Sequence, residues 1–165
     1  MGESIMIDIN IKKGNIIRKI EIDDATQFIN LAMKAVYERG LNDVDFDKPL
    51  FYARCRSILA RATNHTIGLF VDNELVGFSI AQITTQPWST EKICHLNLMH
   101  TDTGHRHEAY YQLMLDSIYT WAKGQGITRF HTSTMAYLLP EQVRTNMLIK
   151  NGYREADIQW EKKID

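Results

Sequence analysis

The sequence is poor in several residue types that define large classes of protein. It has only two cysteines, Cys55 and Cys94, among 165 residues. Two isolated cysteines form neither a disulfide framework nor a zinc-binding pattern, and their scarcity is typical of a reducing compartment. No apolar run approaches the ~20 residues that a membrane-spanning helix needs, so we expect no membrane association. Early charges and the lack of a signal-like apolar segment favour a cytoplasmic protein.

An excess of charge of either sign is also missing. The formal net charge is −1, and no basic stripe with interleaved aromatic residues is present, so we expect no nucleic-acid partner. With three prolines and no low-complexity tract, the chain offers no linker. We therefore expect residues 1–165 to form a single domain with one sizeable core.

Hydrophobic periodicity alternates along the chain between strand-like and helix-like spacing. The pattern predicts strands over 4–22, helices over 24–39 and 48–62, a hairpin over 66–83 turning at 72–74, a strand over 91–100, a helix ended by 123–126, a strand over 127–134, a helix over 140–151 and a closing strand or pair over 153–164. In the third helix, the predicted inner stripe is Tyr110, Leu113, Met114, Ser117, Ile118 and Trp121. Short turns predict antiparallel pairing of the three middle strands, and the long connection after them predicts a parallel crossover.

The segment "MHTDTGHRHEAYYQLM", residues 99–114, takes a strand directly into a helix. Unpaired amides and the dipole at a helix N-terminus favour an anion such as a phosphate. Loops of this kind are normally rich in glycine, but this one contains only Gly104. Arg106 and the flanking His105 and His107 supply basic side chains, whereas Glu108 adds a carboxylate that favours the helix and opposes an anion.

The order of elements, together with four segments in that order, resembles the GCN5-related N-acetyltransferase (GNAT) superfamily over nearly the whole chain. The four segments are "NIIRKIEIDDATQFINLA", "LFVDNELVGFSIA", "HLNLMHTDTGHRHEAYYQLM" and "LIKNGYREA". The resemblance implies an α/β (α+β) fold with a mixed, mostly antiparallel central sheet, helices on both faces and a splayed strand 4/strand 5 pair. It also implies acetyl-CoA as co-substrate and a small-molecule or protein amine as acceptor.

The resemblance implies where acetyl-CoA binds. The backbone of the fourth strand, at Leu98 and Met99, pairs with the pantetheine arm. Amides at the start of the following helix hold the diphosphate, and they fall on Arg106, His107, Glu108, Ala109 and Tyr110. The family's loop glycines are replaced here, because neither register, starting at His105 or at Arg106, places a glycine at the expected positions.

Acid and base candidates follow partly from the family and partly from strand geometry. The family's proton-donating tyrosine falls on Leu148, so Tyr137 is the substitute candidate. Glu91 or His95 could remove the proton of the amine. Strict alternation places Ile93, His95, Asn97 and Met99 on one strand face and Cys94, Leu96, Leu98 and His100 on the other.

Other interpretations remain open. Four histidines lie close together at 95, 100, 105 and 107, but His95 and His100 fall on opposite predicted faces and no HExxH accompanies them, so we expect no metal site. The same fold could instead belong to a catalytically inactive protein that engages another macromolecule. An exposed edge strand makes a homodimer a further expectation.

Overall fold

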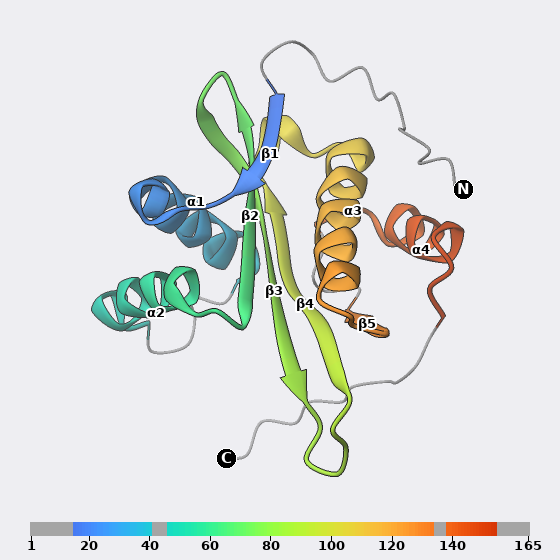
Figure 1. The fold of residues 1–165 in the computed structure, drawn as a ribbon. Helices are drawn as coiled ribbons and strands as arrows, with labels where there is room; N and C mark the ends of the chain where they lie inside the picture. The colour runs from blue at the N-terminus through green and yellow to red at the C-terminus, as the bar shows by residue number, and fades with distance from the viewer. Residues whose placement is uncertain (1–14, 41–45, 134–137, 155–165) are drawn as a thin grey trace, which may run out of the picture.

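The computed structural model describes residues 15–40, 46–133 and 138–154 (Figure 1). Five strands form one sheet in the order β1-β2-β3-β4-β5. The first three pairings are antiparallel, and β4 pairs with β5 in parallel. These pairings confirm the predicted mixed, mostly antiparallel sheet. The strands are β1 (Asn15–Lys19), β2 (Asn64–Val71), β3 (Glu74–Thr85), β4 (Lys92–Thr101) and β5 (Arg129–Thr132).

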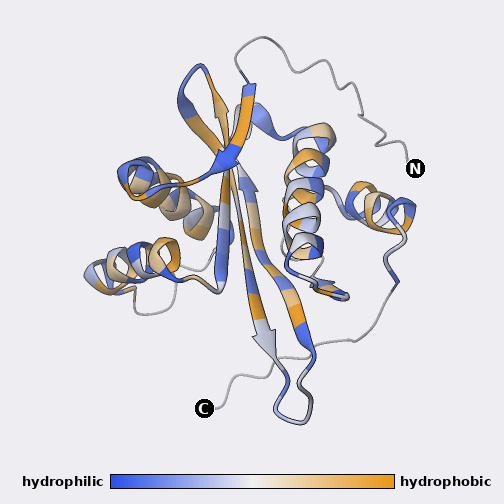
Figure 2. Cartoon of the chain, viewed as in Figure 1, coloured by the Kyte–Doolittle hydropathy of each residue, from blue (hydrophilic) through white to orange (hydrophobic). Residues whose placement is uncertain are grey.

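Helices cover both faces of the sheet, as predicted. In Figure 1, α1 and α2 lie on one side of the strands, and α3 and α4 lie on the other. Each side has its own apolar core, and Figure 2 shows apolar residues running along the central strands between them. No helix within the described ranges is both long and apolar enough to cross a bilayer. The helical elements are η1 (Ile22–Asp24), α1 (Ala25–Glu38), α2 (Lys48–Ala60), η2 (Thr103–His105), α3 (Glu108–Gly124) and α4 (Glu141–Lys150).

The predicted hairpin is present, and its turn explains its sequence. Asp72 and Asn73 have φ values of 50° and 68°. Two successive left-handed residues form the type I′ turn, whose twist matches that of the flanking strands. Asp and Asn tolerate this conformation better than other residues with side chains, which is why this pair marks the turn in the sequence.

The buried face of α3 differs from the predicted stripe. Its buried residues are Tyr111, Met114, Leu115, Ile118 and Ala122. Tyr110, Leu113, Ser117 and Trp121 are only half-buried at the margin of this face. Met114 and Ile118 are buried as predicted, but the buried face is centred about one residue further along the helix, because α3 carries two overlapping apolar stripes. Packing on the sheet selects between them, and the buried hydrogen bond from Thr101 Oγ1 to Tyr111 Oη, at 3.2 Å, belongs to the selected stripe.

A β-bulge in β4 overturns the predicted alternation of its side chains. Ile80 pairs with Leu98 and Ala81 pairs with Leu96, so Asn97 is the extra residue. An extra residue shifts the alternation by one position. Met99 therefore joins Cys94 and Leu96 in the core beneath α3 and α4. Leu98 packs instead on the α1 and α2 core, and by the same shift His95 and His100 project from one face rather than two.

Two predicted elements fall wholly or largely outside the described residues. These are the first part of the strand region over 4–22 and the closing strand or pair over 153–164, of which only 153 and 154 are described.

His100 is a fully buried histidine at the end of β4 nearest α1. Its side chain is 0% exposed and lies beside the Phe78 ring, with ring centroids 5.8 Å apart. Arg39 Nη1 lies 3.4 Å from its Nδ1. Burial, together with the Arg39 guanidinium, lowers the pKa of His100 to about 4. The native protein therefore holds a neutral imidazole at this position.

We expect this histidine to make the fold acid-sensitive. Its native pKa of about 4 lies below the ordinary 6.5, so the unfolded chain takes up the proton first as the pH falls. Above pH 6.5, His100 is neutral in both the native and the unfolded protein and does not reduce the free energy of unfolding. Between pH 6.5 and about pH 4, that free energy falls progressively, by roughly 3 kcal/mol in all. Urea denaturation of the wild type and His100→Gln at several pH values measures it. Parallel pH curves for the two proteins would contradict the expectation.

Candidate active site

β4 continues beyond its recorded pairs with β5, and no other strand of the described residues pairs with that edge. The last recorded β4–β5 pair is Leu96 with Thr132, whereas β4 runs on to Thr101. The Asp102 amide donates to the Val76 carbonyl, on the β3 side, at 2.7 Å. Because alternate residues direct their backbone groups to opposite edges, Met99 and Thr101 direct theirs away from β3. The recorded pairing of β4 with β5 thus ends five residues before β4 does.

Arg39, which directly follows α1, occupies part of that edge. Its Nη2 donates to the Met99 carbonyl at 3.0 Å. Burial lowers the pKa of this guanidinium, which nevertheless stays far above neutrality and remains charged. One of the two residues predicted to hold the pantetheine arm through its backbone is therefore already hydrogen-bonded. Nothing in the sequence signals this contact, because Arg39 and Met99 lie 60 positions apart.

The start of α3 partly satisfies its own amides. His107 is the N-cap residue, and its Nδ1 accepts the Ala109 amide proton at 3.2 Å. The amides of Tyr110 and Tyr111 donate to the His107 carbonyl. The exposed Glu108 is the first helical residue and places its carboxylate in the positive field of the helix dipole. An anion that binds here has to displace the His107 imidazole from Ala109.

Ion pairs tie the connection between β4 and α3 to α1. Arg106 pairs with Glu38, and Lys34 Nζ lies 3.1 Å from Asp102 Oδ2. The hydrogen bond from Lys34 lowers the pKa of Asp102, so this carboxylate stays ionised. Together with Arg39, these α1 residues form what we call the α1 clasp: Lys34, Glu38 and Arg39. Lys34 and Arg39 of the clasp contact the end of β4 and Asp102 just after it, and Glu38 pairs with Arg106 before the start of α3.

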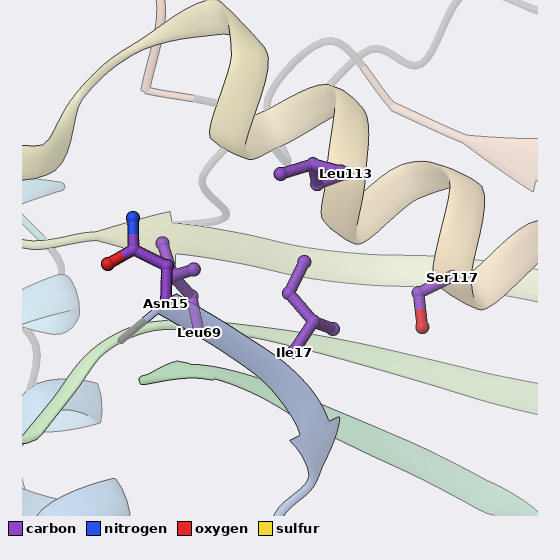
Figure 3. Close-up of a pocket in the computed structure, with 5 residues that line it drawn as sticks. All are labelled: Asn15, Ile17, Leu69, Leu113 and Ser117. Atoms are coloured by element: carbon purple, nitrogen blue, oxygen red, sulfur yellow. The ribbon is translucent and has the colours of Figure 1, made fainter. Parts of the chain in front are cut away.

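Tyr110 faces β1 rather than the β4 edge. Its hydroxyl accepts a hydrogen bond from Asn15 Nδ2 at 3.1 Å. A cavity of about 240 Å³ lies between β1 and α3, beside Asn15 (Figure 3). The strand order separates the β1 wall of this cavity from β4 by two strands, so the cavity lies outside the predicted acetyl-CoA site. Its lining residues are Asn15, Ile17, Leu69, Leu113 and Ser117.

Glu91 lies just before β4, at the opposite end from the α3 loop. Its Oε1 accepts a hydrogen bond from Thr128 Oγ1 at 3.0 Å and lies 3.1 Å from Arg129 Nε. The ten residues of β4, at ~3.3 Å each, place Glu91 roughly 30 Å from the predicted diphosphate seat. Because the Glu91 carboxylate is bound by Thr128 and Arg129, it is less available to accept a proton than the neutral imidazole of a histidine.

His95 lies within β4, two residues before the bulge, and is half-buried. Burial lowers its pKa, and so does His131, its register partner on β5. A histidine that is neutral near pH 7 can accept a proton. His131 is a neighbour that the sequence reasoning missed, because only the β4–β5 register brings the two residues together.

The acid candidates are less informative. Tyr137 lies outside the described residues. Leu148, at the family's tyrosine position, is buried in the apolar core beneath α3 and α4 and has no proton to donate. Burial raises the pKa of Cys94 to about 11, so its thiol is a poor nucleophile. Within the described ranges, no three His, Cys, Asp or Glu side chains gather as a metal centre requires.

Comparison with known proteins gives matches at the level of structure. No protein-family model matches the sequence, and no curated protein matches it significantly. A ribosomal-protein-alanine N-acetyltransferase from Brucella melitensis biovar Abortus 2308 matches with a TM-score of 0.66 and 22% identity, over 92% of this chain and 98% of that one. A predicted acetyltransferase with acetyl-CoA from Clostridium acetobutylicum matches with 0.72 and 15%, over 90% and 96%.

An aminoglycoside acetyltransferase from an uncultured soil metagenomic sample, in complex with trehalose, matches with a TM-score of 0.73 and 12% identity, over 94% of this chain and 99% of that one. Such likenesses extend over nearly the whole length of both chains. This chain therefore has the GNAT fold, as its sequence resemblance predicts.

The Glu38–Arg106 ion pair generates a prediction about anion binding. We expect Glu38→Gln to bind ADP, a soluble diphosphate probe, about two- to fivefold more tightly, because a half-exposed ion pair of ~0.5–1 kcal/mol no longer competes for Arg106. Titration calorimetry at low ionic strength measures the dissociation constant. Glu74→Gln, on the exposed β2–β3 turn, is the matched control. Equal affinities for Glu38→Gln and wild type would show that Glu38 does not compete with the ligand.

Proposed function

We propose that this protein transfers an acetyl group from acetyl-CoA to a primary amine of a small molecule or protein. The observation that carries the proposal is the β4 edge beyond Leu96, which no strand of the described residues covers and which a short loop joins to the N-terminus of α3. An extended arm can pair with the backbone of such an edge while a diphosphate meets the helix dipole. The acetyltransferase fold, and a structural neighbour that was crystallised with acetyl-CoA, support the same assignment.

The residues at the site fit acetyl-CoA if three internal contacts are exchanged. Arg39 releases the Met99 carbonyl, Arg106 exchanges Glu38 for the diphosphate, and His107 releases the Ala109 amide. A group of acetyl-CoA can replace each of these contacts. The pantetheine arm carries amides that can bond to the Met99 carbonyl, and the diphosphate carries negative oxygens that can bond to Arg106 and the Ala109 amide. Arg106 then supplies positive charge to the diphosphate, while Lys34 stays paired with Asp102.

The reaction requires a neutral amine and a base. Amines are largely protonated near pH 7, so a base has to take the proton before the nitrogen attacks the thioester carbonyl. Of the two base candidates, His95 is favoured over Glu91, because the Glu91 carboxylate is engaged by Arg129 and Thr128. The bulge at Asn97 interrupts the β3–β4 ladder about 7 Å along the strand from His95, which places the base near the interrupted backbone.

A second candidate function rests on the same contacts. If the Glu38–Arg106 pair and the His107 cap persist, the fold has no anion seat, and the protein acts as an inactive binding module for another macromolecule. The choice between the two functions is therefore a question about acetyl-CoA binding.

We expect acetyl-CoA to raise the melting temperature. Stabilisation grows as RT ln(1 + [L]/Kd), about 2.7 kcal/mol at one hundred times Kd, or roughly 5–10 °C for a chain of this size. Differential scanning calorimetry with increasing acetyl-CoA measures it. S-acetylcysteamine, which has the thioester but no diphosphate, is the control ligand and should cause little change. No shift at millimolar acetyl-CoA would favour the binding-module alternative.

We expect Ala109→Asp to weaken acetyl-CoA binding by roughly tenfold, because the new carboxylate adds negative charge beside the diphosphate. An aspartate in the first turn of a helix is compatible with the helix dipole, so the variant should still fold. Ala109→Asn changes the shape similarly without the charge and serves as the control. Unchanged affinity in Ala109→Asp would place the diphosphate away from the start of α3.

A further inference from the structure

Two histidines lie side by side where β4 and β5 last run together. His95 and His131 are register partners, and their ring centroids are 5.1 Å apart with the planes at 90°. The next pair along the strands is the last one recorded, so the two imidazoles lie at the fork of the sheet. The acetyl transfer proposed above uses His95 but gives no role to His131.

The neighbouring side chains show which face the imidazoles occupy. Cys94, Leu96 and Phe130 pack in the core beneath α3 and α4. Because successive strand residues point to opposite faces, His95 and His131 project from the face that carries α1 and α2. Both are half-buried, so each ring is partly open to solvent.

The surroundings of His95 favour an uncharged imidazole. Burial lowers the pKa of His95, and His131 lowers it further. The residue opposite His95 on β3 is the uncharged Gln82. The nearest charged groups along the two strands are the exposed Lys92 and Arg129, the second of which is paired with Glu91. His95 is therefore more readily neutral than an ordinary histidine, and His131 is the group beside it that contributes to this.

We propose that His131 acts with His95 as a two-imidazole unit, in which His95 is the catalytic base and His131 is a positioning residue that sets its protonation and passes its proton to solvent. This inference rests on the proposed acetyl transfer. It adds His131, and it assigns the pH dependence of the reaction to the pair.

The proposed step balances in atoms and charge. The ammonium group of the acceptor gives one proton to the neutral imidazole of His95. The freed lone pair on nitrogen forms the new C–N bond to the thioester carbonyl carbon. The C–S bond then breaks, and its electron pair leaves with the sulfur of CoA. The second nitrogen proton neutralises that thiolate, and the proton on His95 leaves through His131 to water.

The test compares pH profiles of kcat/KM for wild type, His95→Ala and His131→Asn, with a panel of primary amines that includes an aminoglycoside and a peptide beginning with alanine. For His95→Ala we expect a loss of about 100-fold, partly rescued by added imidazole. For His131→Asn we expect the acid limb of the profile to move to higher pH, because a group that lowers the pKa of His95 has been removed. A purely structural defect lowers activity at every pH without moving that limb.

An NMR titration of the His95 imidazole in the substrate-free protein gives a second readout. Its pKa should rise in His131→Asn, whereas His65→Gln, which removes a half-buried imidazole stacked on Trp121 from the opposite face, should leave it unchanged. An unchanged His95 pKa in His131→Asn overturns the pairing. An active wild type whose profile is insensitive to both histidines overturns this inference alone. Absence of acetyl-CoA binding and of transfer across the panel overturns the proposed function and this inference together.

Discussion

Backbone groups on the free edge of β4 are the constraint on which the rest of this structure depends. Where β5 ends, Met99 and Thr101 direct amide and carbonyl groups away from β3, and such groups are costly to bury without partners. Arg39 satisfies the Met99 carbonyl, and the other α1 clasp residues neutralise charges on the loop that follows β4. Unpaired backbone groups cost free energy when they are buried. The same groups can hydrogen-bond to an extended substrate arm.

Groups at the start of α3 are likewise bonded to other groups of the protein. Loops that bind phosphates commonly use glycines so that amides remain accessible, and this loop has histidines instead. His107 bonds to the Ala109 amide, and Glu38 bonds to Arg106, so the substrate-free protein holds internal substitutes for the negative oxygens of a ligand. Under the proposed function, acetyl-CoA binding would exchange these internal partners for groups of the ligand. The affinity for acetyl-CoA then depends on the free energy of the internal contacts that are lost, and a partly exposed ion pair contributes little to it.

Local patterns in the sequence predicted most of the fold. The Asp72–Asn73 turn, the helical spacing of apolar residues over 24–39 and the strand-to-helix passage near residue 100 each have a local physical cause, and the structure confirms the elements that they predicted. The wrong predictions have non-local causes. The bulge at Asn97 arises from the register between β3 and β4, and the stripe of α3 is selected by the sheet beneath it. Neither leaves a periodic signal of its own.

For the candidate site, the sequence by itself determined the residue types near the end of the fourth strand and the helix N-terminus that follows it. Only the tertiary structure decided that Arg39 and Glu38 reach this loop from α1, and that His131 lies beside His95. The physical reason is that hydrogen bonds and ion pairs act over a few ångströms in space, whatever the separation along the chain. Residues that are 36 to 68 positions apart meet because the strand order and register place them together.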